Sequence, residues 1–387
     1  MFVEGQFRYL ILGVFGLLGL YFTLEREVPV FKTKEILGNK PCISKARPLH
    51  LSDGYDPKDT TPMRLVVAYF RSGSTMTADL IRHIDDDFYL FEPLHDLSSA
   101  LLKFKNKTSI QFLNGTRRYF STGDIEKIYP EMIFNWFACN FKDLDLNGLT
   151  NSFIPSFTPE HSDYIKCVRL FHGKFSRMKT TKKCVHLLRK RCLTAKTRTI
   201  KTIRFTMSMT EKLLAWLPGL KIVHLIRDPR GILNSRFEKN VEVMNLQVAA
   251  EELCDQISSD VTLYNDIESC YKDRMMRVTY EEMCQSPLII VSKIYRFLGS
   301  RFTDHVKDYI DQTLKGPIKH CGYCTDRGNA LANAYRWLTV IEEDSLNVID
   351  QNCSFLYKQF GYFHLQYDIL ADFKIHGKTS RRIKIRP

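Results

Sequence analysis

The chain has 387 residues, of which 44% are hydrophobic and 26% are charged. This is ordinary globular composition, so it excludes a wholly disordered chain and allows one large domain or two small ones. The net charge of +13 indicates an anionic partner, without choosing among nucleic acid, lipid head groups, a polyanionic glycan and a nucleotide.

The N-terminus predicts the compartment. An uncharged apolar run covers 9–24, between Arg8 and Glu25. It suits either a cleaved signal peptide or an uncleaved signal-anchor, and the lack of a small-x-small cleavage site after it favours the anchor. We therefore expect a short cytoplasmic tail at 1–8, a transmembrane signal-anchor at 9–24 and a proline-punctuated stem at 25–62.

The cysteines and the glycosylation sequons agree with a secretory lumen. The chain has 11 cysteines, a number that fits an oxidising compartment and the formation of disulfides. Asn106, Asn114 and Asn352 each begin an N-x-S/T sequon. Cys321-Gly-Tyr-Cys324 has no second C-x-x-C to complete a zinc site, so we expect a disulfide or two unrelated cysteines and no metal.

Hydrophobic patterning then predicts strands and helices in alternation. The strands are expected at 64–70, 88–91, 221–226 and 276–279. The helices are expected at 75–84, 208–217, 245–272 and 287–299, with a further helix that begins at Pro229. Ser208 with Glu211 suits a capping box, and Asp228 with Pro229 suits an N-cap followed by the first helical residue. The prediction is an α/β domain at 63–365, with a P-loop-like, largely parallel sheet flanked by helices, followed by a basic tail at 366–387.

The first polar loop joins the first strand to its helix. It contains Arg71, Ser72, Gly73, Ser74, Thr75, Met76 and Thr77. Backbone N–H groups at a helix N-terminus, hydroxyls and an arginine suit a phosphate cradle, although a polar turn that caps a helix would look similar. A Walker A loop is disfavoured, since only one glycine is present and no lysine ends the loop.

The second polar loop follows the strand at 221–226. Arg227 stands at the strand exit, and Ser235 lies about two turns into the next helix. Asp228 is expected to cap that helix rather than meet an anion. Ligands of parallel sheets bind at the carboxyl ends of the strands, so both loops are expected at one edge. Two anion loops suit a ligand with two separated phosphates, such as 3′-phosphoadenosine-5′-phosphosulfate (PAPS).

Both loops resemble motifs of the Golgi carbohydrate 6-O-sulfotransferases, which act on galactose, N-acetylgalactosamine or N-acetylglucosamine. The family motif W-R-S-G-S-S-F is similar to 70–76, and L-V-R-D-P-R-A-x-x-x-S-R is similar to 225–236. R-Y-E-D-L resembles 279–283, and S-R-N-A followed by W-R resembles 326–330 with 336–337. The resemblance runs from about 64 to 362. Thr75-Met76 replaces Ser-Phe, Gly328 is an extra residue, and Arg336-Trp337 reverses the order.

The resemblance implies in-line sulfuryl transfer from PAPS, without a metal. Arg71 would hold the 5′-phosphate and stabilise the leaving oxygen, while 72–77 line the cradle. Arg227 and Ser235 would hold the 3′-phosphate, and Arg327 would add a contact to it.

For the base that deprotonates the acceptor we choose Glu92, which resembles the family's Y/F-E-P. The alternatives are a salt-bridged or capping glutamate and His95 as the base. Lys201 and Arg204 would line the sulfate or acceptor path.

The expected partners are PAPS, a glycan or glycosaminoglycan acceptor, and the Golgi membrane through a type II anchor; we also allow for a homodimer. A nucleic-acid partner is disfavoured by the anchor, the sequons and the cysteines. The rival functions are a tyrosylprotein sulfotransferase and a non-catalytic lumenal glycan-binding protein.

The positive charge is unevenly distributed along the chain. From Tyr164 to Thr210 there are 14 Lys/Arg and no Asp or Glu, which suits either a solvated face or a surface for an anionic ligand.

Overall fold

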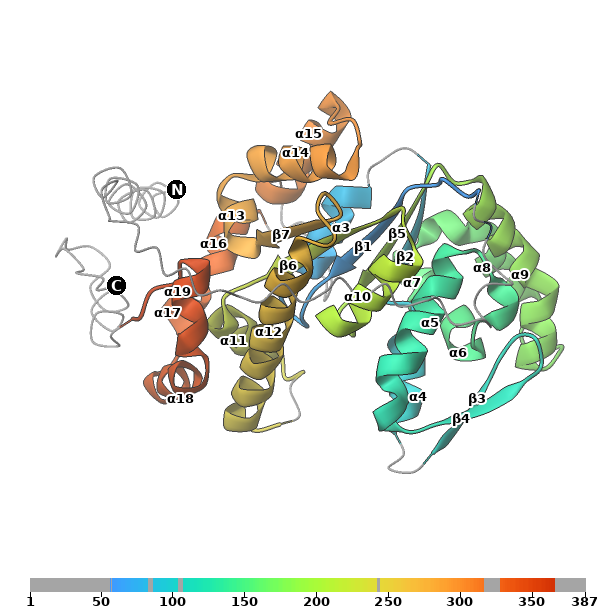
Figure 1. Cartoon of the computed structure of the whole chain (residues 1–387), viewed down its shortest axis with the longest axis horizontal. Helices are drawn as coiled ribbons and strands as arrows, with labels where there is room; N and C mark the ends of the chain where they lie inside the picture. The colour runs from blue at the N-terminus through green and yellow to red at the C-terminus, as the bar shows by residue number, and fades with distance from the viewer. Residues whose placement is uncertain are drawn as a thin grey trace, which may run out of the picture. The chain divides into compact units, whose positions relative to one another are not determined.

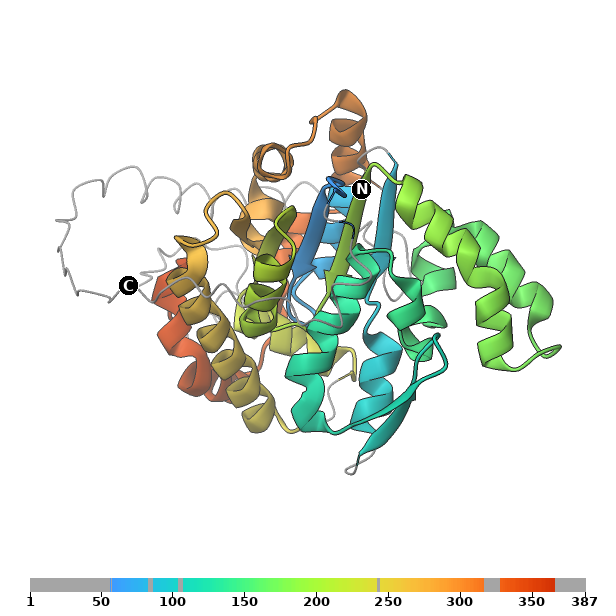
Figure 2. The same cartoon turned by 45° about the vertical axis from the view of Figure 1, so that its right-hand side comes forward.

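The computed structural model describes residues 56, 58–82, 86–103, 107–241, 244–316 and 328–365 (Figures 1 and 2). Several predicted features lie outside these residues. They are the tail at 1–8, the anchor at 9–24, all but the end of the stem, the basic tail at 366–387, Asn106, Cys321 with Cys324, and Arg327. Within the described residues, no helix combines the length and apolarity that a membrane crossing needs.

A five-stranded parallel sheet forms the centre of the structure (Figure 1). In spatial order its strands are β2 (Asp87–Phe91), β5 (Thr197–Thr202), β1 (Met63–Val67), β6 (Leu220–Ile226) and β7 (Met275–Thr279). Met63 of the central strand is in register with Arg198 of β5 and Leu220 of β6. The predicted parallel sheet flanked by helices is confirmed.

Helices cover both faces of the sheet, so each face has its own apolar core. Leu65 and Val67 pack into a core with α5 (Ile125–Phe137), α10 (Met207–Trp216) and α12 (Leu246–Glu268). Val66 of the same strand faces the opposite core, built with α3 (Ser74–Arg82), α13 (Tyr280–Gln285), α14 (Pro287–Leu298), α15 (Asp304–Lys315) and α16 (Ala330–Tyr335). This alternation follows from the two-residue period of a strand.

The remaining elements surround these layers. They are α4 (His95–Leu102), the antiparallel hairpin of β3 (Thr108–Gln111) and β4 (Arg117–Phe120), α6 (Leu146–Leu149), α7 (Ile154–Phe157), α8 (Ser162–Phe171), α9 (Arg177–Thr194), α11 (Pro229–Glu238), α17 (Trp337–Val340), α18 (Glu343–Cys353) and α19 (Tyr357–Phe360).

Two local predictions differ from the structure. Thr206, rather than Ser208, is the N-cap of α10, because its hydroxyl accepts a hydrogen bond from the Met209 N–H, while the Ser208 hydroxyl donates to Glu126. Strand β5 was not predicted, because T-R-T-I-K-T has no apolar run. All six of its residues are nevertheless buried, and Thr197 Oγ1 donates to Asp87 Oδ1 over 2.7 Å. The predicted N-cap at Asp228 is confirmed.

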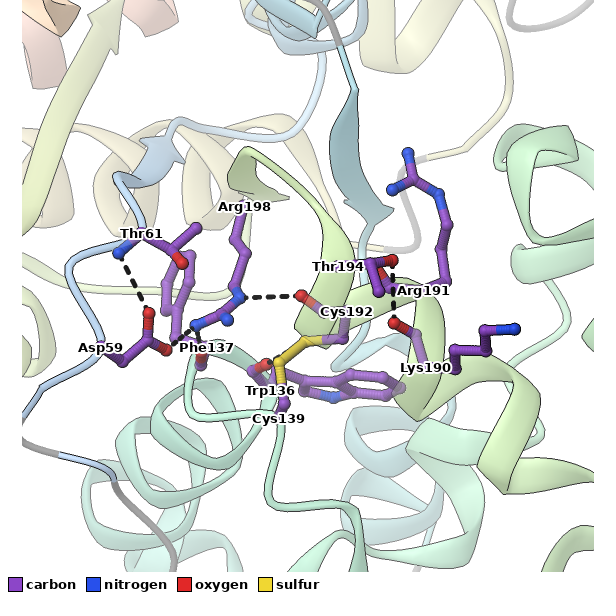
Figure 3. Close-up of a disulfide and its surroundings, with 10 residues drawn as sticks. All are labelled: Asp59, Thr61, Trp136, Phe137, Cys139, Lys190, Arg191, Cys192, Thr194 and Arg198. Atoms are coloured by element: carbon purple, nitrogen blue, oxygen red, sulfur yellow. Dashed lines mark hydrogen bonds and ion pairs between the residues drawn. A yellow bond between two sulfur atoms is a disulfide. The ribbon is translucent and has the colours of Figure 1, made fainter.

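Three disulfides join pairs of cysteines within the described residues, as the cysteine content predicted. They join Cys139 to Cys192, Cys167 to Cys184 and Cys254 to Cys353. Figure 3 shows the first of them beside Arg198, whose side chain is 2% exposed. Arg198 donates to the carbonyl oxygens of Phe137 and Cys192 and pairs with Asp59. This cation therefore fastens the segment before β1 to the sheet, and loss of Asp59 would leave it buried without a counter-charge.

We expect the disulfide that closes the longer loop to stabilise the fold more. Cys254 and Cys353 are 99 residues apart, and Cys167 and Cys184 are 17 apart. Loop-closure entropy predicts losses of about 4.7 and about 3 kcal/mol on removing the two bridges. Denaturant unfolding of the Cys254→Ala/Cys353→Ala and Cys167→Ala/Cys184→Ala proteins measures both. An equal or reversed order would contradict the entropic account.

Candidate active site

A cleft of about 410 Å³ opens at the carboxyl ends of four strands. Phe70 and Arg71 line it after β1, and Phe91 and Glu92 line it at the end of β2 and just after it. Lys201 lines it from the end of β5, Arg204 from the loop after β5, and Arg227 from the loop after β6. Its lining contains six cationic side chains, Arg71, Lys201, Arg204, Arg227, Lys239 and Arg336, against the two carboxylates of Glu92 and Glu238. The cleft therefore favours an anionic ligand.

The first loop turns sharply before α3. Arg71 and Gly73 both adopt positive φ, at 68° and 88°. A Cβ built on Gly73 would lie 2.2 Å from the Tyr280 ring, so both the backbone angle and the close contact require glycine here. Gly73, Ser74, Thr75 and Met76 line the cleft together with Arg71.

Two predicted loop residues lie behind the cleft rather than in its lining. Ser72 and Thr77 are fully buried. Thr77 Oγ1 donates to the Gly73 carbonyl over 3.2 Å, so this hydroxyl supports the first turn of α3. The backbone, more than these side chains, shapes the loop.

Direct hydrogen bonds join the two predicted loops. Arg71 Nε donates to Ser235 Oγ over 3.1 Å, and Arg227 Nη1 donates to the Arg71 carbonyl over 2.9 Å. The Arg227 guanidinium lies over the Tyr280 ring, 4.7 Å from its centre. Gly231 leaves room for this arginine, since a Cβ there would lie 3.1 Å from Arg227 Nε. The structure thus brings Arg71, Arg227 and Ser235 into one site.

Asp228 serves the protein rather than a ligand, as predicted. It accepts the N–H of Arg230 and pairs with that side chain at 2.8 Å. Behind it, Glu281 Oε1 accepts the Asp228 N–H, and Tyr362 Oη donates to Glu281 Oε2. Burial, with Asp228 nearby, raises the pKa of Glu281 to about 7. No role was predicted for Glu281, although the motif at 279–283 contains it.

Glu92 is held between two cations. It is 2% exposed, has a φ of 51°, and pairs through one oxygen with Lys201 and through the other with Arg204. Burial lowers the pKa of Lys201, while Glu92 opposes that shift. The structure therefore assembles the three residues that the sequence placed on the acceptor side, and it does so through strand β5.

His95 lines the cleft as part of a carboxylate–imidazole pair. Its Nδ1 lies 2.5 Å from Asp96 Oδ1, and its ring packs 4.2 Å from that of Phe153. Asp96 also accepts hydrogen bonds from the Ser152 N–H and hydroxyl, at 2.9 and 3.1 Å. Neither Asp96 nor Ser152 was predicted. The histidine–aspartate neighbours in the sequence were the one signal that could have suggested this pair.

Fold and site together define an α/β protein with a cationic cleft at the carboxyl ends of its parallel strands. Residues 62–359 match the sulfotransferase domain family, and the chain belongs to this family. The family match confirms the predicted enzyme class.

Curated relatives include carbohydrate sulfotransferase 1 of Mus musculus, which is 27% identical over 77% of this chain and 78% of the relative. Carbohydrate sulfotransferase 4 of Mus musculus is 20% identical over 82% of this chain and 88% of the relative. These relatives confirm the resemblance predicted from the motifs. Among solved structures, the sulfotransferase domain of the Synechococcus PCC 7002 olefin synthase aligns with 81% of this chain and 99% of its own, with 16% identity and a TM-score of 0.43.

Gly73→Ala should destabilise the protein more than an alanine at another positive-φ glycine. Gly115 has a φ of 97°, but a Cβ there would meet no atom within 4 Å. Gly115→Ala should therefore cost about 1 kcal/mol from backbone strain alone, while Gly73→Ala adds the collision with Tyr280 and should cost at least twice as much. Denaturant unfolding of both variants gives the comparison. Equal losses would mean that the Tyr280 contact does not constrain the loop.

Proposed function

We propose that this enzyme transfers a sulfuryl group from PAPS to a sugar hydroxyl, at the 6-position of galactose, N-acetylgalactosamine or N-acetylglucosamine. The observation that carries the proposal is the hydrogen bond from Arg71 to Ser235, which joins two anion-binding loops in one cationic cleft. The names of the carbohydrate sulfotransferase relatives support the carbohydrate acceptor.

The donor would lie along the two loops. Arg71 would contact the 5′-phosphate and stabilise the charge that develops on the leaving oxygen, with the N–H groups of the α3 N-terminus beside it. Arg227 and Ser235 would hold the 3′-phosphate. Arg227 Nε is buried, and among the described residues it has no hydrogen-bond partner, so an acceptor oxygen placed there would satisfy it. Arg327 stays a prediction for the same phosphate.

The acceptor hydroxyl would enter on the side of β2 and β5. Glu92 is the predicted base, and its ion pairs with Lys201 and Arg204 would fix its position. His95 is the second candidate, because Asp96 would orient its ring and stabilise the imidazolium that forms after proton transfer. Lys201 would neutralise charge on the sulfuryl group as it moves.

The lumen of the Golgi is the proposed compartment, with 9–24 as a type II anchor and 63–365 as the lumenal domain. The three disulfides support an oxidising lumen. Asn114 lies in an exposed turn, where a glycan has room, while Asn352 is partly buried. The homodimer stays a prediction.

Arg71→Ala should abolish most sulfate transfer. Loss of a cation that stabilises the leaving group costs about 100- to 1,000-fold in kcat. The measurement uses the full chain from a secretory host, radiolabelled PAPS, and chondroitin, keratan, N-acetylglucosamine-terminated oligosaccharides and a tyrosine peptide as acceptors. Arg301→Ala, an exposed arginine outside the cleft, is the control and should keep full transfer. Transfer to the peptide alone would favour a tyrosylprotein sulfotransferase. If the protein neither transfers sulfate nor binds PAPS, a glycan-binding protein would be favoured.

Glu92→Gln should lower kcat by about 100- to 10,000-fold if Glu92 is the base. It should also destabilise the fold, because Lys201 and Arg204 lose their counter-charge. His95→Gln is the matched comparison and should lose less activity. Affinity for the product nucleotide, measured by calorimetry, should change only a few-fold in both. A large kcat loss in His95→Gln, with near-normal kcat in Glu92→Gln, would transfer the role of base to His95.

A further inference from the structure

Helix α9 carries five Lys/Arg side chains and one histidine along its outer face, here named the basic stripe. The stripe consists of Lys179, Lys182, Lys183, His186, Arg189 and Lys190, all of them exposed. At 100° per residue these six positions fall within an arc of about 120°, and they extend over about 17 Å of helix. The basic side chains are therefore gathered on one side of the helix and are not scattered around it.

The opposite face of α9 is buried and fixed. Cys184, Leu188 and Cys192 on this face are at most 1% exposed. Cys184 is disulfide-bonded to Cys167 of α8, and Cys192 to Cys139 beyond α5. Two covalent links hold the helix against the body, so the stripe is displayed in one orientation.

The composition of the stripe works against the stability of its own helix. Lys179 lies three and four residues before Lys182 and Lys183, and like charges at these spacings destabilise a helix by about 0.2–0.5 kcal/mol per pair. The first turn of α9 contains no acidic residue, although anions are favoured there. Among the described residues, no carboxylate forms an ion pair with the stripe; Lys183 instead lies over the rings of Phe171 and Phe175. An external polyanion would relieve this repulsion.

The N-terminal end of α9 is connected to the cleft through a short chain of contacts. Arg177 donates to Asn147 Oδ1 of α6 over 3.3 Å. Two residues after α6, Asn151 Nδ2 donates to the Glu92 carbonyl over 2.8 Å. These contacts fix the position of α9 relative to the Glu92 side of the cleft.

We propose that the basic stripe binds an anionic polysaccharide chain, rich in uronate or sulfate, at sugars beyond the one that is sulfated. This inference rests on the proposed function for the identity of the bound chain as acceptor. A membrane surface is the other partner with anionic groups. A helix that lies in a membrane interface needs an apolar face for the lipid, whereas the apolar face of α9 is buried in the protein.

The test compares two triple variants with equal changes in charge. Lys179→Gln/Lys182→Gln/Lys183→Gln removes half of the stripe, and Lys272→Gln/Lys293→Gln/Lys358→Gln removes three exposed lysines elsewhere. Affinity for long chondroitin chains, measured by calorimetry at several salt concentrations, needs no activity. The stripe variant should bind at least tenfold less tightly and with a weaker salt dependence, since fewer counterions are released. The control should match the wild type.

Kinetics then separate the stripe from the cleft. With chondroitin as acceptor, the stripe variant should show a raised KM for long chains, with unchanged kcat and unchanged KM for a tetrasaccharide. Equal chondroitin affinity in both triple variants would overturn the proposal, even if transfer occurs. Lost binding to phosphatidylserine vesicles with unchanged chondroitin affinity would also overturn it, in favour of a membrane surface. Lost chondroitin affinity in a protein that transfers no sulfate would support the stripe and contradict the proposed function.

Discussion

The burial of the Arg227 guanidinium is the constraint on which the arrangement of the site depends. A buried cation must be paired or hydrogen-bonded, since removing it from water costs several kcal/mol. Arg227 meets this requirement by donating to backbone carbonyls of Arg71 and Ala334 and by lying over the Tyr280 ring. The hydrogen bond from Arg227 to the Arg71 carbonyl thereby holds the first loop against the second. This contact places the Arg71 side chain within hydrogen-bond distance of Ser235.

Tyr280 transmits this constraint to the rest of the fold. Its ring fills the space beside Gly73 and packs under Arg227, and its hydroxyl oxygen accepts a hydrogen bond from Asn333 Nδ2 of α16. The next residue, Glu281, contacts the N-terminus of α11 through the Asp228 N–H. One short segment after β7 therefore positions both loops, which gives a physical reason for a tyrosine–glutamate pair at this point.

The sequence predicted the positions of the two polar loops well because their signals are local. A strand, a polar turn with a glycine and a capped helix follow one another within a few residues, and these patterns depend little on the rest of the chain. Strand β5 was missed because its burial is satisfied at long range: Asp87, Asp59 and Glu92 supply partners to Thr197, Arg198 and Lys201. The support of Asp96 by Ser152 spans 56 residues and leaves no local pattern.

For Glu92, long-range ion pairs determine which of its predicted roles the structure supports. From the sequence it is one carboxylate after a strand, and both a structural and a catalytic role remain open. In the structure its two cations come from β5 and the loop that follows, so the carboxylate could not be removed without leaving Lys201 uncompensated in the core. Structural and catalytic roles are therefore compatible here, because the pairing that stabilises the sheet edge also orients the carboxylate.

The positive charge of the chain has two different physical consequences. In the cleft, cations such as Arg227 and Lys201 are buried, so their charge acts at short range in a low dielectric and specifies geometry. On α9 the cations are exposed, and their field reaches about 8–10 Å before physiological salt screens it. A field of that kind raises the local concentration of an anionic chain without fixing its register. The two disulfides on the inner face of α9 keep this self-repelling helix in place on the body of the protein, so its charge is displayed in a fixed position.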